Sequence, residues 1–181
     1  MTNHQRERLL DPTGASGDRD DGTLAPRPRS LRGLTVGLLD NTKPNAPMLL
    51  DLIGEILVAA HGVAELRRYV KDYFGTPAKP GLVAQVAREC DIVVTAVGDC
   101  GSCSAATVAD GIQLEAAGVP TVAICSDSFR MSGRAMAQVQ GFPGYEFVTV
   151  LHPVASLDEN GLRDRARDVL PQALQVLGVE A

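Results

Sequence analysis

Two cysteines separated by two residues, Cys100 and Cys103 in the run Cys-Gly-Ser-Cys, are the side chains best suited to chemistry. The apolar run before them, 91–98, is typical of a buried strand, and residues 104–112 resemble the opening of a helix. Two thiols at this spacing can close a small disulfide ring. The first turn of a helix has free N–H groups and the positive end of the helix dipole, which favour a thiolate over a thiol. The motif therefore predicts a redox-active pair at a strand-to-helix turn.

The positions of the two cysteines predict different roles. Cys100 belongs to the turn itself, so we expect it to be more exposed and to act as the nucleophile. Cys103 lies one turn further into the helix and suits the role of the resolving thiol, which displaces the adduct and leaves a disulfide. The alternative is a pair of small buried residues that pack a tight turn. Free structural cysteines usually occur singly in apolar surroundings, which favours the chemical interpretation.

Short apolar segments alternate with amphipathic ones from residue 31 onward, which predicts alternating strands and helices. The connections are short, so the expected fold is α/β: a three-layer, doubly wound, mainly parallel sheet, flavodoxin-like or Rossmann-like. Strands are expected at 34–39, 64–70 (at or near an edge), 91–97, 121–125 and 146–151. Helices are expected from an Asn45 cap to 61, at 80–89, after the cysteine motif, at 132–140 and at about 158–177.

In such a fold, ligands bind beyond the carboxyl ends of the strands. Polar side chains follow each expected strand, and we predict that they share this rim. His152 follows the last strand and is a candidate general acid or base, or a residue that orients a thiolate. The alternative is that it simply hydrogen-bonds the turn before Pro153. Lys43 is a candidate for holding an anionic group, although most loop lysines are only solvated. The predicted substrate-binding residues are Asn41, Lys43, Asn45, Asp99, Ser102, Ser104, Cys125 and Ser126.

No metal and no cofactor is predicted. Cys100, Cys103, Cys125 and His152 are ligand types that zinc accepts, yet the chain has no second CxxC and no HxxxH. The turn from Gly98 to Gly101 resembles a phosphate cradle, but it lacks both the lysine of a P-loop and the spacing of a dinucleotide fingerprint.

Composition excludes several classes of partner. A net charge of −5 and a pI near 5.1 argue against binding nucleic acid or an anionic membrane. No apolar run approaches the roughly 18 residues of a membrane span, and the N-terminus has no signal-peptide core. Four cysteines do not form the framework of a secreted domain, so we expect a reducing, cytoplasmic environment.

Residues 1–30 differ from the rest, because they contain no Val, Ile or aromatic residue. They cannot bury enough apolar surface to offset their ordering entropy. We expect a flexible tail or, alternatively, an arm whose Leu9 and Leu10 dock on a partner subunit. Residues 31–181 are then a single α/β domain. The protein could form a homo-oligomer or bind a larger partner subunit.

The cysteine motif resembles that of a bacterial family named for selenocysteine-Gly-Ser-Cys, the UGSC-type (seleno)proteins. Cys100 falls where some relatives carry selenocysteine, which implies a nucleophilic, redox-active chalcogen. A distant similarity to the selenocysteine subunit of glycine-reductase-type complexes, where C–N bonds are cleaved reductively, is limited to this turn and a later His-Pro. The resemblance covers most of 31–156 and rests on 37–45, 97–104, 118–122 and His152-Pro153; Asp11-Pro12-Thr13-Gly14 also resembles a family element.

Three functions follow from these observations. The first is a thiol-dependent oxidoreductase, or an enzyme of reductive carbon–heteroatom cleavage, acting on a small polar molecule, with His152 or Asp99 handling protons. The second is a cofactor-independent isomerase or lyase in which Cys100 and Cys125 flank the substrate. The third is a non-catalytic small subunit of a heteromeric biosynthetic complex.

Overall fold

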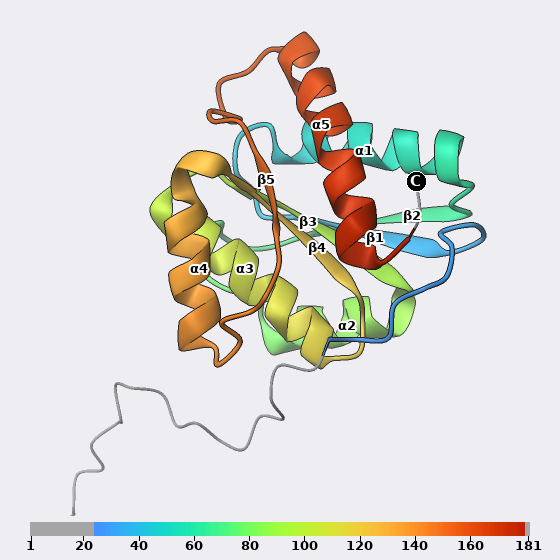
Figure 1. Cartoon of the computed structure of the whole chain (residues 1–181), viewed down its shortest axis with the longest axis horizontal. Coiled ribbons are helices and arrows are strands. Elements are labelled where there is room, and N and C mark those ends of the chain that lie inside the picture. Colours follow the sequence, from blue (N-terminus) through green and yellow to red (C-terminus); the bar gives the residue numbers. More distant parts are fainter. Residues whose placement is uncertain (1–23, 180–181) are drawn as a thin grey trace, which may run out of the picture.

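A computed structural model describes residues 24–179 of the chain, which fold around a five-stranded parallel sheet (Figure 1). The strands lie in the order β2-β1-β3-β4-β5, and all neighbours pair in parallel. The prediction of a doubly wound, flavodoxin-like sheet is therefore confirmed. The strands are β1 (Thr35–Asp40), β2 (Glu65–Val70), β3 (Ile92–Gly98), β4 (Thr121–Ser126) and β5 (Val148–Val150).

Helices cover both faces of the sheet, which makes three layers (Figure 1). On one face α1 and α5 pack against each other and against the sheet, and on the other α2, α3 and α4 do so. Neighbouring strand residues contribute to opposite cores: Leu38 lies in the first and Leu39 in the second. The helices are α1 (Ala46–His61), α2 (Pro80–Glu89), α3 (Gly101–Ala116), α4 (Arg130–Val139) and α5 (Glu159–Leu177), with a 3₁₀ turn, η1 (Asp127–Phe129), before α4.

Position in the sheet explains the pattern of each strand. β3 and β4 are central and every residue in them is buried, which matches their continuous apolar runs. β2 lies at the edge, as predicted, and carries exposed charged side chains such as Glu65. β5 is shorter than the predicted strand 146–151, because only Val148–Val150 pair with β4. α4 starts at Arg130 rather than at residue 132, directly after η1.

Residues 24–30, which precede the predicted domain 31–181, make contacts with α3. The buried carboxylate of Glu115, at the end of α3, needs donors, and this segment supplies them. The Ala25 N–H donates to Glu115 over 2.8 Å, and the Arg27 guanidinium pairs with it over 2.8 Å. The rest of the predicted tail, with Leu9, Leu10 and residues 11–14, lies outside the described residues.

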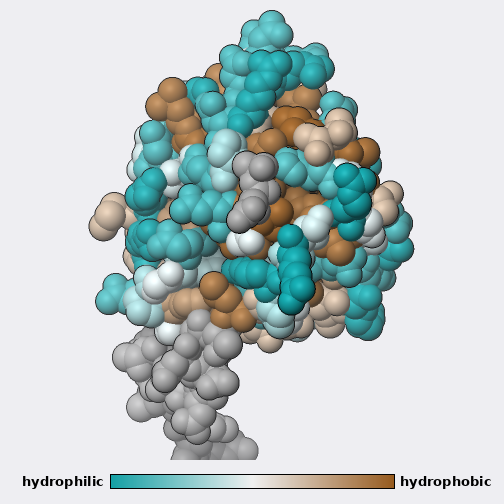
Figure 2. All heavy atoms as spheres, turned by 45° about the vertical axis from the view of Figure 1, so that its right-hand side comes forward, coloured by the Kyte–Doolittle hydropathy of each residue, from teal (hydrophilic) through white to brown (hydrophobic). Residues whose placement is uncertain are grey.

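The surface of residues 24–179 is mixed in character. Hydrophilic side chains predominate on the face shown in Figure 2, with apolar ones interspersed among them. Within the described range, no helix combines the length and the apolar character that a membrane crossing requires.

Candidate functional site

The loops that follow the parallel strands meet at one rim of the sheet, as predicted. Backbone hydrogen bonds tie neighbouring loops together there: the Asn41 N–H donates to the Ala96 carbonyl over 3.1 Å, and the Lys71 N–H donates to the Asp40 carbonyl over 2.9 Å. Three helices, α1, α3 and α4, begin within a few residues of this rim. The sequence segments that carry the candidate side chains are therefore neighbours in space.

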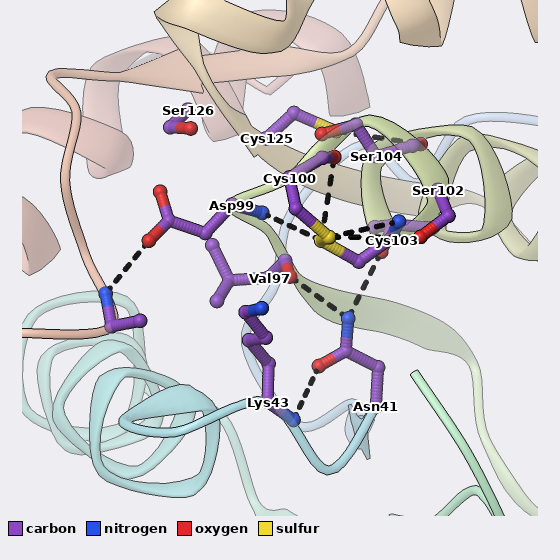
Figure 3. Close-up of a disulfide and its surroundings, with 12 residues drawn as sticks. Asn41, Lys43, Val97, Asp99, Cys100, Ser102, Cys103, Ser104, Cys125 and Ser126 are labelled. Carbon is purple, nitrogen blue, oxygen red and sulfur yellow. Dashed lines mark hydrogen bonds between the residues drawn. A yellow bond between two sulfur atoms is a disulfide. The ribbon is translucent and has the colours of Figure 1, made fainter. Parts of the chain in front are cut away.

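The motif cysteines are joined as a disulfide at the start of α3, with their Cα atoms 5.4 Å apart (Figure 3). Cys100 is the N-cap residue of this helix, and its Sγ accepts the Cys103 N–H over 3.3 Å. Cys100 is partly exposed, whereas Cys103 is fully buried and its Sγ receives the Asp99 N–H over 3.2 Å. The pair at this helix N-terminus thus joins a partly exposed cysteine to a fully buried one.

Gly98 lets α3 approach the end of β3 closely. A Cβ at this position would lie 2.6 Å from the Ser104 Cα and 2.7 Å from the Cys125 Sγ, so neither neighbour leaves room for it. At Gly101 the nearest atom to a Cβ is the Ser132 Oγ, at an ordinary 3.7 Å. Gly98 and Gly101 therefore differ in how much stability a side chain at each position would remove.

We expect Gly98→Ala to lower the free energy of unfolding by about 1–3 kcal/mol, because the backbone of α3 must shift to admit the methyl group. Gly101→Ala is the matched control and should be tolerated, since alanine suits the first turn of a helix. Denaturant unfolding of both variants in the oxidised form checks this. Equal losses for the two variants would contradict the argument.

The buried Asp99 carboxylate connects the cysteine motif to the loop after β5. Its Oδ2 accepts the N–H groups of Val154 and Ala155, over 3.0 and 2.8 Å. Its Oδ1 lies 2.9 Å from the His152 Nδ1. The Ser126 Oγ lies 3.2 Å from the same ring nitrogen. Strand ends β3, β4 and β5 thus each supply one member of an Asp99–His152–Ser126 cluster.

His152 is held on two further sides. Its backbone N–H donates to the Asp127 carboxylate over 3.0 Å, and this bond is the main reason that the pKa of Asp127 is lowered. The Phe129 ring meets the imidazole edge-on, with centroids 5.4 Å apart. The His152 side chain remains 36% exposed, so a fixed ring still has an accessible side. Contacts with Asp99, Ser126 and Phe129 therefore fix the position of the imidazole.

The side-chain amides of two predicted substrate-binding residues form hydrogen bonds with other groups of the protein. Asn41 is fully buried, and its Nδ2 donates to the Val97 carbonyl over 2.9 Å. Asn45 does not cap α1 through its side chain; it donates instead to the carbonyls of Val154 and Leu157, over 3.0 and 2.9 Å. Asn45 is thus the N-cap residue of α1, as predicted, while its side-chain amide ties the β1–α1 loop to the loop after β5.

The other predicted residues differ in how deeply they are buried. Lys43 is half-buried and lies over the Phe74 ring, 4.6 Å from its centroid. Ser102 is exposed, whereas Ser104, Cys125 and Ser126 are fully buried. Burial raises the pKa of the Cys125 thiol to about 12, so this thiol stays protonated. The predicted residues that remain at least partly exposed are thus Lys43, Asn45, Cys100, Ser102 and His152.

A buried ion pair between Lys71 and Asp110 was not predicted. Both side chains are almost inaccessible, and the Ala78 N–H adds a 2.6 Å hydrogen bond to the carboxylate. The pair fastens the loop after β2 to the middle of α3. The available signal was an aspartate inside the apolar helix segment 108–112, where an unpaired charge is costly.

Potential metal ligands are dispersed in residues 24–179: no three side chains of His, Cys, Asp and Glu lie close enough to share one ion. The two thiols of the motif are bonded to each other, and Cys125 is enclosed behind them. The four zinc-type residues considered from the sequence therefore do not form a ligand set in this structure.

The model of the UGSC family matches residues 8–179, nearly the whole chain. No curated protein and no solved structure matches it. The match includes the cysteine motif, the His-Pro and residues that precede the described domain.

Proposed function

Because the chain belongs to the UGSC family and carries a disulfide at a helix N-terminus, we propose that it is a thiol-dependent redox enzyme. Cys100 attacks a small polar substrate, and Cys103 resolves the adduct. The observation that carries this proposal is the asymmetry of the pair: a partly exposed sulfur backed by a buried one within bonding distance.

The reaction balances as a two-electron reduction of the substrate. The Cys100 thiolate forms a bond to an electrophilic atom, and the leaving group departs with the electron pair of the broken bond and takes up a proton. The Cys103 thiolate then attacks the Cys100 Sγ; the S–S bond forms, and the electron pair of the sulfur–substrate bond goes to the substrate, which is protonated. A reducing dithiol, of the kind that a cytoplasm supplies, restores the two thiols.

A redox titration with mass-spectrometric mapping tests this proposal. We expect Cys100 and Cys103 to form a reversible disulfide, and Cys100 to be alkylated first in the reduced protein. Cys90 and Cys125 serve as internal controls, because both are buried and burial raises the pKa of each. They should react only after unfolding. Absence of a reversible disulfide between the motif cysteines would overturn the proposal.

The two other functions make different predictions. An acid/base enzyme with Cys100 and Cys125 needs Cys125 and tolerates Cys103→Ser, whereas the buried Cys125 side chain supports the redox proposal instead. A non-catalytic subunit keeps its complex when both motif cysteines become serine. Mapping the products and complexes of these variants separates all three functions.

A further inference from the structure

We propose that Asp99 is a positioning residue that fixes the neutral His152 ring as the Nδ1–H tautomer, leaving Nε2 as the atom that exchanges protons with the substrate. This inference rests on the proposed function for its chemical role, and on the hydrogen bonds around Asp99 for its geometry. The sequence indicated only that either residue might handle protons; the contacts assign the two different tasks.

The donors around Asp99 determine where the ring proton lies. A carboxylate accepts hydrogen bonds and has none to give. Its Oδ2 is occupied by the two backbone N–H groups of Val154 and Ala155. Its Oδ1, 2.9 Å from the His152 Nδ1, therefore requires the N–H of the ring. The Ser126 hydroxyl also faces Nδ1, but it can either donate or accept and does not select a tautomer.

With Nδ1 occupied, Nε2 is the free atom of the ring. In the described part of the chain no hydrogen bond to Nε2 is found, and more than a third of the side chain is exposed. The edge-on contact with Phe129 and the backbone bond to Asp127 restrict the ring from two sides. The ring is thus held by one nitrogen and presents the other to a ligand.

The carboxylate and the nucleophile occupy consecutive positions in the chain. The Asp99 N–H contacts the Cys103 sulfur, while its carboxylate points away from the disulfide toward the loop after β5 (Figure 3). No bond joins the His152 ring to either motif sulfur among the described residues. In this proposal His152 acts on the substrate: as imidazolium it gives its Nε2 proton to the leaving group while Cys100 forms its bond, and its Nδ1–H stays hydrogen-bonded to the Asp99 carboxylate.

Asp99→Asn tests the tautomer with little change of shape. The oxygen of the new amide must face the two N–H donors of Val154 and Ala155, so its NH₂ group faces Nδ1. Nδ1 must then accept, and the proton moves to Nε2. We expect ¹⁵N–¹H correlation spectra of the histidine-labelled full chain, at a pH where the ring is neutral, to show Nδ1–H in the native protein and Nε2–H in the variant. His152→Gln assigns the signal among the three histidines.

Asn45→Ala is the matched control, because it removes hydrogen bonds to the same loop and leaves Asp99 in place. It should retain the Nδ1–H tautomer. The inference is wrong if the native ring carries its neutral proton on Nε2, or if Asp99→Asn and Asn45→Ala give the same spectrum. Neither result depends on the cysteines, so the redox proposal stands or fails separately.

Leaving-group dependence tests the proton transfer itself. Bis(2-hydroxyethyl) disulfide has a basic leaving thiolate that gains from an acid, whereas the thionitrobenzoate of Ellman's reagent leaves without one. We expect His152→Gln to slow reduction of the first by at least about tenfold and to leave the second nearly unchanged. Asp99→Asn should also slow reduction of the first reagent and spare the second, and the pH dependence of its reduction rate should differ from that of the native protein. Equal slowing of both reagents would contradict proton transfer and indicate damage to the cysteine pair.

Discussion

Cys103→Ser is expected to arrest the protein as a covalent adduct on Cys100, with steady-state reduction of bis(2-hydroxyethyl) disulfide lowered on the order of a thousandfold or more. The buried Cys103 is bonded to the partly exposed Cys100, and the other two cysteines of the described residues are free and buried. Without Cys103 the second step has no nucleophile within the protein, so the mixed disulfide accumulates until the external dithiol cleaves it. Intact-mass measurement after one turnover should show one substrate fragment per chain.

Cys100→Ser and Cys90→Ser complete the test. Cys100→Ser should form no adduct at all, because serine at this position is a far weaker nucleophile than a thiolate. Cys90→Ser is the matched control: it removes a buried cysteine at the opposite end of β3, where a hydroxyl can keep the contact with Tyr69. It should turn over normally. An adduct of Cys103→Ser located on any residue other than Cys100 would contradict the assigned order of attack.

Lys71→Met is expected to lower the free energy of unfolding by about 3–5 kcal/mol, because it leaves the Asp110 carboxylate buried without its cation. In the native protein, burial raises the pKa of Asp110, and Lys71 with the Ala78 N–H partly opposes this. Without Lys71 the folded-state pKa rises further above the unfolded value. Loss of the Asp110 proton then favours the unfolded state. The loss of unfolding free energy in Lys71→Met should therefore grow as the pH rises. It should shrink as the pH falls toward 3.8, the ordinary pKa of an aspartate.

Denaturant unfolding of Lys71→Met and of the native protein, measured at several pH values from about 3.8 upward, checks this prediction. Two further variants serve as comparisons. Lys79→Met removes an exposed ion pair with Asp72 from the same loop and should leave stability unchanged. Lys71→Met combined with Asp110→Asn should recover most of the loss, since an amide oxygen can still accept the Ala78 N–H. A deficit for Lys71→Met that is independent of pH would show that lost packing, rather than the unpaired carboxylate, is responsible.

Strand and helix order could be predicted because each element has its own local pattern. The apolar runs of β3 and β4 indicate strands buried on both faces, and Pro80 marks the start of α2. Elements of weak pattern were placed less accurately: β5 is only three residues long, and its ends depend on pairing with β4. Residues 24–30 have no core pattern, and they pack because a distant carboxylate, Glu115, needs their N–H and guanidinium groups.

By itself the sequence determined the sheet, the rim and the thiol pair at a helix start, since these follow from short-range periodicity and spacing. Only the tertiary structure decided which rim residues are exposed and which are buried or bonded to the protein. It buried Cys125, bonded Asn41 and Asn45 to protein groups, and brought Asp99 to His152, 53 residues further along the chain. A residue type shows what a side chain can bond to, but which partner it meets depends on how far each loop extends and how closely the helices pack.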